Sequence, residues 1–122
     1  MGEEDDFPEI RGSVRALCAG FPGEYWRAKD RERAYPAEFV AALTRAGFLA
    51  ALIPEEYGGS GLSLAAAAAI MEEIQAAGCN GAAAHAQMYI MNTLLRHGRG
   101  AEAAPSSRYR AWRAPAPGFR YF

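Results

Sequence analysis

The sequence predicts an all-α protein of four or five helices followed by an irregular tail. Apolar residues recur at helical spacing through most of the first 98 residues, and glycines stand where helices should end. The single short run that could be extended has no second strand to pair with. We therefore predict one helical domain over residues 1–98 and a separate tail over residues 99–122.

Two helices and a polar connection are predicted in the first part of the chain. Asp6 is a candidate N-cap for the first helix, which Gly20 should end. Residues 21–35 alternate in charge and form a connection that could be helical in part. Pro36 stands at the first position of the next helix, and Gly47 should end it. The first helix has one apolar face, made by Phe7, Ile10, Val14 and Leu17.

The following part is predicted to hold a loop and two more helices. The apolar run at residues 49–53 is expected to be extended, because Pro54 restricts the residue before it. Residues 55–61 form a loop by composition. Ser63 and Asn80 then cap two further helices, and glycine follows each of them. Alanine-rich faces on both helices would allow them to approach closely.

The composition narrows the classes of function. Hydrophobic residues make up 51% of the 122 residues, which indicates a globular chain, and the net charge of -1 gives no reason to expect a nucleic-acid or membrane partner. The first residues are acidic where a secretory signal would be basic and then apolar, so we expect a cytoplasmic protein. Cys18 and Cys79 predict neither a metal site nor a disulfide scaffold, and we expect two reduced, partly buried thiols.

Two features resemble functional sites, but a structural role explains each of them better. Residues 58–61 are as rich in glycine as a phosphate-binding loop, but no lysine follows, and Glu55 and Glu56 would repel an anion. A tight structural loop is therefore predicted. Glu72 and Glu73 are neighbours, which point about 100° apart on a helix and cannot face one bond together. We expect them to form a solvated helix edge.

The last predicted helix carries the residues of most interest. His85 and His97 lie roughly 18 Å apart along a helix, so they cannot share a metal ion. We interpret His85 as a buried, hydrogen-bonded group, with the wall of a pocket as the alternative. Met88, Met91 and Leu95 recur at helical spacing. That pattern is typical of core packing and also suits the wall of a pocket for an aliphatic ligand, and both interpretations stay open.

Five stretches of the chain resemble the N-terminal domain of the acyl-CoA dehydrogenases. The clearest is the loop LIPEEYGGSGL at residues 52–62. The other four are YPAEF at 35–39, AGF at 46–48, MEEI at 71–74 and HAQMYIMNTLLRHG at 85–98. Their order and spacing are similar to those of the family throughout residues 7–98.

The resemblance implies a function, and it implies that different domains have different roles in that function. It implies a flavoprotein of three domains that removes two hydrogens from an acyl-CoA, with a carboxylate base taking the α-proton and FAD accepting hydride from the β-carbon. The N-terminal domain would supply part of the acyl-pocket wall, and later domains the base and most flavin contacts. We therefore expect no catalytic residue, no metal ligand and no FAD bound by this chain alone. The expected pocket wall is made by Gln87, Met88 and Met91.

The resemblance ends at Gly98, where the family normally continues without a break. Only Lys29 among the thirteen basic residues is a lysine, a bias that indicates GC-rich coding DNA. Shifting the codons of residues 99–122 by one nucleotide permits a sequence that resembles the continuation of the family. We therefore interpret the tail as out of frame and disordered, and the chain as a truncated first domain that is inactive alone.

Two other functions stay open. The chain could be a non-catalytic helical binding or interaction module, because apolar surface that the family buries between domains would be exposed and could drive self-association. Alternatively, the arginines and aromatic residues interleaved in residues 99–122 could bind nucleic acid. An out-of-frame segment from GC-rich DNA would have the same composition, so this signal is weak.

Overall fold

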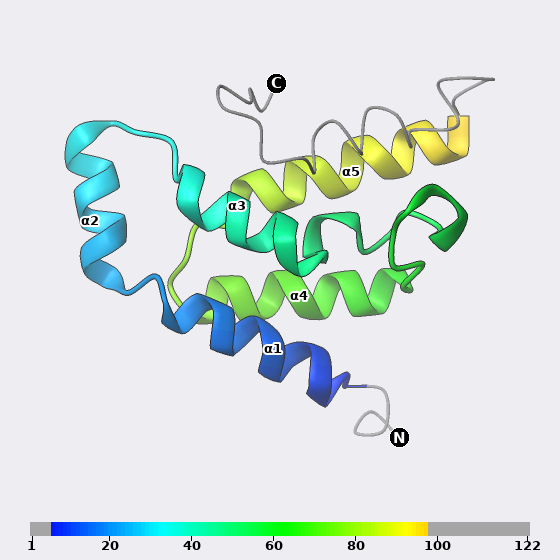
Figure 1. Ribbon diagram of the computed structural model, residues 1–122, viewed down its shortest axis with the longest axis horizontal. Coiled ribbons are helices and arrows are strands. Elements are labelled where there is room, and N and C mark those ends of the chain that lie inside the picture. The colour runs from blue at the N-terminus through cyan, green and yellow to red at the C-terminus, as the bar shows by residue number, and fades with distance from the viewer. Residues whose placement is uncertain (1–5, 98–122) are drawn as a thin grey trace.

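The computed structural model describes residues 6–97, which form five α-helices and no strand (Figure 1). The prediction of an all-α fold is therefore confirmed. Two short 3-10 turns, η1 (Phe48–Ala50) and η2 (Glu55–Tyr57), lie between the third and fourth helices. The predicted tail at residues 99–122 lies outside the described residues. The helices are α1 (Pro8–Ala19), α2 (Gly23–Glu32), α3 (Ala37–Ala46), α4 (Leu64–Ala76) and α5 (Ala82–His97).

The helices pack around one main core. In Figure 1, α1 runs along α4, α5 lies on the other side of the molecule from α1, and α2 stands at one end. α5 is supported along its length by α3, η1 and α4. The largest fully buried side chains are Val14, Phe39, Val40, Leu43, Leu49, Ile53, Ile70 and Ile74.

The start of α1 differs from the prediction. Asp6 is not the N-cap: Phe7 occupies that position with a φ of 51°, and no side chain caps the first turn. Asp6 instead binds Arg11, whose Nη2 lies 2.8 Å from Oδ1 and whose Nε donates to the Asp6 carbonyl at 2.7 Å. Pro8 at the first helical position has no N–H that would need an acceptor, which lowers the need for a cap. Gly20 follows the end of α1, as predicted.

The polar connection at residues 21–35 is largely helical, because α2 occupies most of it. α2 has no fully buried residue, and its aromatic side chains attach it to the rest of the fold. Phe21, Tyr25, Trp26 and Phe39 make edge-to-face contacts, with ring centroids 4.9 to 5.2 Å apart. Trp26 Nε1 donates to the Phe21 carbonyl at 3.0 Å, and the Tyr25 hydroxyl donates to Glu38 at 2.8 Å.

The prediction of an extended run at residues 49–53 is wrong. η1 turns the chain there instead, directly after Gly47, whose φ of 84° suits a residue without a side chain. Short apolar runs do not distinguish a strand from a buried turn, and here the following loop covers the run. Main-chain hydrogen bonds of 2.7 to 3.1 Å fold that loop back, from the amides of Ser60, Gly61 and Leu62 to the carbonyls of Ala50, Ile53 and Ala51.

The predicted caps of the two alanine-rich helices are confirmed, but α4 packs most extensively on α1 rather than on α5. Ser63 caps α4 by accepting a hydrogen bond from the amide of Ala66 at 3.1 Å, and Gly78, with a φ of 77°, follows the end of that helix. Asn80 accepts a hydrogen bond from the amide of Ala82 at 2.9 Å, where α5 begins. Buried alanines on α4 allow α1 to pack directly against it.

A buried carboxylate joins α1 to α4. The Glu73 side chain is 9% exposed, and Arg15 donates to it from Nε at 2.8 Å and from Nη2 at 2.9 Å. Arg11 lies 3.1 Å from the same carboxylate and 2.9 Å from Glu72. The predicted solvated edge is therefore correct for Glu72, which is 65% exposed, and wrong for Glu73. Neighbouring helical positions face different directions, so Glu73 is buried against α1 while Glu72 reaches Arg11 from the exposed edge of α4.

The Glu73 carboxylate should make the stability of the fold depend on pH. Hydrogen bonds from Arg15 lower the pKa of Glu73, burial opposes this, and Arg11 lowers it further. A lowered pKa in the folded state contributes stability that is present above about pH 4.3, the ordinary glutamate value, and is lost as the pH falls through the folded pKa. We expect Glu73→Gln to lower the melting temperature at neutral pH and to weaken this acid dependence. Thermal melts across acid pH, with Glu72→Gln as the exposed control, measure both effects. Equal losses from the two variants would contradict the prediction.

Gly59 should tolerate no side chain, because a Cβ placed there would overlap the carbonyl oxygen of Ile53. We expect Gly59→Ala to lower the free energy of unfolding by about 1–3 kcal/mol, as overpacking does. Gly12 is the matched control, because it lies within α1 and a Cβ added to it would have no heavy atom within 4 Å. Gly12→Ala should raise stability by about 0.5–1 kcal/mol. Urea denaturation compares the two, and a neutral Gly59→Ala would show that the loop can move away from Ile53.

Candidate functional site

α5 has one buried stripe, and its two edges are turned toward different parts of the fold. Met88 belongs to the main core. Met91 belongs to a second cluster of buried residues, with Ala50 and Ile53. Side chains four positions apart share a face of a helix, so Gln87 lies on the same face as Met91. Any ligand that contacts α5 therefore meets one of two different surfaces.

The first surface borders a groove of about 360 Å³ between α4 and α5. Two of its apolar residues are largely exposed, Leu64 by 67% and Tyr89 by 53%. The His85 ring packs edge-on against Tyr89, with 5.1 Å between the ring centroids. His85 is exposed and lines the groove, so its interpretation as a buried group is wrong, and the alternative of a pocket wall is correct. The remaining lining comes from Leu52, Ala67, Ala68, Met71, Glu72, Met88 and Asn92.

The second surface contains a polar group in an apolar setting. Gln87 is 5% exposed, and its Nε2 atom has no hydrogen-bond partner within residues 6–97. A buried donor is nearly always paired, since leaving it unsatisfied costs about 1–3 kcal/mol. Met91, one turn further along α5, packs with Ala50 and Ile53, and Tyr57 and Leu94 pack against the same cluster. An unpaired donor of this kind is expected where a ligand or another part of the protein supplies the acceptor.

The three residues predicted to line a pocket are thus all buried on one stripe of α5, but the two edges of that stripe have different surroundings. Gln87 and Met91 share the second surface, whereas Met88 packs in the main core and lines the groove beside α4. The helical spacing of the methionines is consistent with both arrangements, so the sequence pattern alone did not separate them. The unpaired amide singles out the Gln87 face as the better candidate.

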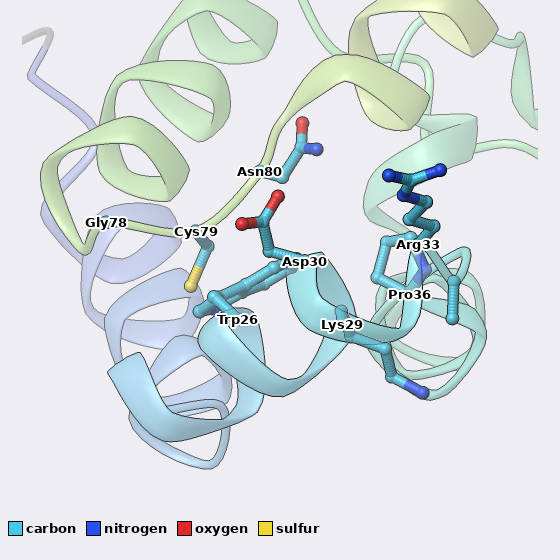
Figure 2. A pocket seen from close by; sticks show the side chains of 9 residues that line it. Trp26, Lys29, Asp30, Arg33, Pro36, Gly78, Cys79 and Asn80 are labelled. Carbon is cyan, nitrogen blue, oxygen red and sulfur yellow. The ribbon is translucent and has the colours of Figure 1, made fainter.

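A second hollow, of about 400 Å³, lies between the end of α2 and the turn that joins α4 to α5 (Figure 2). Trp26 forms part of its wall, and Asp30 and Arg33 bring opposite charges to it. Lys29 points away from its centre in Figure 2, and its Nζ lies 3.3 Å from Glu38. Because the charges are mixed and one already has a partner, this hollow favours no single class of ligand.

A third hollow, of about 470 Å³, lies between the ends of α1 and α4 and is bordered by Cys18. Burial raises the pKa of the Cys18 thiol to about 12, and the neighbouring Cys79 adds to the rise. The thiol is therefore protonated at neutral pH and is not a nucleophile. Both cysteines are free, and they are 4% and 3% exposed, so they are more deeply buried than predicted.

The glycine-rich loop at residues 58–61 does not fit the phosphates of a cofactor. Gly59 makes its close approach to Ile53 of the same chain, and Glu55 and Glu56 are exposed beside it. No cluster of metal-binding side chains occurs in the part of the chain that the structure describes. Within the same residues, no helix combines the length and the apolar character needed to cross a membrane.

Comparison with known proteins identifies relatives of the chain. The family model described as acyl-CoA dehydrogenase, N-terminal domain, matches residues 4–103. Acyl-CoA dehydrogenase FadE12 of Mycobacterium tuberculosis is 34% identical over 76 residues, which cover 62% of this chain and 20% of the relative. The probable acyl-CoA dehydrogenase FadE25 of the same organism is 38% identical over 74 residues, covering 61% of this chain and 18% of the relative.

A more distant organism supplies a further relative. The probable acyl-CoA dehydrogenase YdiO of Escherichia coli is 41% identical over 51 residues, which cover 41% of this chain and 13% of the relative. The chain thus spans about one fifth or less of the length of the relatives it matches. No solved structure gives a significant match to it.

The unpaired amide should weaken the isolated chain. We expect Gln87→Met, which keeps the size of the side chain and removes its donors, to raise the free energy of unfolding by about 1–3 kcal/mol. Gln75→Met is the control, because Gln75 lies exposed on α4 and its substitution should change stability by less than about 0.5 kcal/mol. Chemical denaturation of the 122-residue chain measures both. A loss of stability in Gln87→Met would mean that the amide is already satisfied.

Proposed function

The chain belongs to the acyl-CoA dehydrogenase family, as its N-terminal domain, and we propose on this basis that it serves in the α,β-dehydrogenation of an acyl-CoA thioester. Because the chain spans about a fifth of its relatives, the reaction is that of a whole protein. The family is generally FAD-dependent, and the flavin supplies the acceptor for the hydride that leaves the β-carbon. The contribution of this chain is part of the wall around the acyl chain.

The buried face of α5 is the observation that carries this proposal. It combines the flexible, apolar Met91 with a neighbouring donor on Gln87 that has no partner among the described residues. A methionine side chain adapts its shape to an aliphatic ligand. Met88 packs α5 against the main core from the adjacent face, so it supports the wall. We therefore assign direct contact with the acyl chain to Gln87 and Met91 and a supporting position to Met88.

We infer that the chain is inactive alone and that other parts of a whole protein supply the catalytic base and most flavin contacts. The two carboxylates of α4 support this inference. Glu73 is held by Arg15 and Arg11 and cannot approach a substrate carbon without breaking these contacts. Glu72 lies at the surface, paired with Arg11. Neither is placed to take a proton beside the Gln87 face of α5.

An interaction module without catalysis is the second candidate function. The groove between α4 and α5 favours it, because Leu64 and Tyr89 expose large apolar side chains at this one place. Exposed apolar surface of this kind marks places where proteins associate. In this alternative the groove, rather than the Gln87 face, would be the functional surface of the chain.

A chimeric enzyme tests the proposed function. Residues 6–97 would replace the matching segment of FadE12 from Mycobacterium tuberculosis, and dye-coupled oxidation of acyl-CoAs would be measured beside flavin absorbance. We expect the chimera to hold FAD and to oxidise acyl-CoA, and the 122-residue chain alone to do neither. Met91→Trp should shorten the longest acyl chain accepted at unchanged flavin content.

Tyr89→Trp is the matched control for that substitution, because Tyr89 is 53% exposed and lies on the groove side of α5. It should leave the preference for chain length unaltered. If the chimera holds FAD but Met91→Trp also leaves the preference unaltered, the acyl chain does not pass Met91. A chimera without activity, together with self-association of the 122-residue chain that Leu64→Ser abolishes, would favour the interaction module.

A further inference from the structure

We propose that Gln87 selects acyl-CoA substrates whose acyl chain carries a neutral oxygen atom, by donating a hydrogen bond from Nε2 to that oxygen. The inference rests on the proposed function and names a narrower class of substrate for the same surface. The observation behind this inference is the buried amide nitrogen of Gln87, which has no partner among residues 6–97 although the residue is only 5% exposed.

The chemistry of the amide defines what is missing. A glutamine side chain has two N–H donors on Nε2 and one acceptor on Oε1. With the amide oriented as in the structure, Nε2 is the atom without a partner and the absent group is an acceptor. If the amide were turned over, a donor would be needed instead, and a hydroxyl group can serve as either. A saturated hydrocarbon chain has no acceptor and would leave the donors unsatisfied after binding, which is unfavourable in a buried site. A hydroxyl, keto or ether oxygen would satisfy them.

Neither α5 nor the described residues that pack with Met91 offer a cation beside Gln87, so we take this oxygen to be neutral. A carboxylate at the end of an acyl chain would need a cation, because burial of an unpaired charge is costly. α5 carries no lysine or arginine before Arg96, which is exposed and roughly 13 Å further along the helix. His85 lies on the other side of α5, in the groove. The residues that pack with Met91 are Ala50, Ile53, Tyr57 and Leu94, and none of them is a cation.

The reaction limits where the oxygen can be. The α- and β-carbons are the reacting carbons in the proposed dehydrogenation, and an oxygen on either would change the chemistry of the reaction itself, so we place the oxygen on the γ-carbon or beyond. Met91 lies four residues from Gln87, a rise of about 6 Å along α5, and gives the chain an apolar contact next to the polar one. The class of substrate that fits both contacts is an aliphatic acyl-CoA with a single oxygen substituent on the distal part of its chain.

The test compares hexanoyl-CoA with analogues that carry a hydroxyl on the γ-, δ- or ε-carbon, in the chimeric enzyme described above. We expect at least one hydroxylated analogue to have a kcat/KM at least about tenfold above that of hexanoyl-CoA, since a site built to donate to a substrate oxygen discriminates against analogues without it. Gln87→Met should abolish that ratio, and Gln75→Met should keep it. The Kd of each CoA ester, measured from the shift of flavin absorbance under anaerobic conditions, should change in parallel.

Three results would overturn the inference while leaving the proposed function intact. Equal kcat/KM values for all four esters would show that no distal oxygen is recognised. A fall of the same size for all esters in Gln87→Met would place the amide on the thioester carbonyl, which they share. An unchanged ratio in Gln87→Met, and in a second variant Gln87→Leu, would mean that the oxygen is bound elsewhere. A chimera that holds no FAD or oxidises none of the esters would instead overturn the proposed function, and the inference with it.

Discussion

The fold depends on one buried charge being neutralised across two helices that are distant in sequence. Glu73 is 9% exposed, and a carboxylate in that position is tolerable only because Arg15 and Arg11 donate to it from α1. This requirement fixes the rotation of α1 and its position along α4 at the same time. The apolar side of α1 then meets the alanines of α4, and the core closes between them. α3, η1 and α5 pack on the side of α4 that this contact leaves free.

The packing beneath α5 differs between the Met88 side and the Met91 side, and this difference bears on function. Its Met88 face is held by the main core, while the Met91 face has only a small cluster beneath it. A domain selected only for stability would fill the second face with apolar side chains, yet Gln87 places an amide there. Proteins commonly accept such local losses at places where a ligand is recognised, because the group that destabilises the free protein is the one that the ligand satisfies. The polar residue is therefore better explained by a role in binding than by a role in folding.

Local signals in the sequence predicted the helices well, because caps and stops depend on a few neighbouring atoms. Ser63, Asn80 and Gly47 act as their residue types predict. The errors concern features that depend on residues far away in the sequence. The prediction of a solvated edge was wrong at Glu73 because the partners of Glu73 lie on α1. The prediction of an extended run was wrong at residues 49–53 because a later loop folds back over them. The same distinction between local and distant causes holds for the candidate site. Helical spacing placed Met88 and Met91 on one stripe, as core or as pocket wall, and the family resemblance added Gln87 to the expected wall. That Gln87 lacks a partner among the described residues depends on what packs opposite α5, which no local pattern records.

The arginines and the carboxylate of the ion-pair network are far apart in sequence, and this affects how the chain folds during translation. Arg11 and Glu73 are 62 positions apart, and ribosomes add about 5–20 residues per second, so α1 exists for roughly 3–12 s before its counterion has been synthesised. A helix of 12 residues does not persist by itself in water, so α1 spends this interval largely as unstructured chain with its apolar residues uncovered. α1 therefore docks only after α4 has emerged from the ribosome. Slow translation of the intervening codons would lengthen the time during which chaperones, or other nascent chains, can bind it.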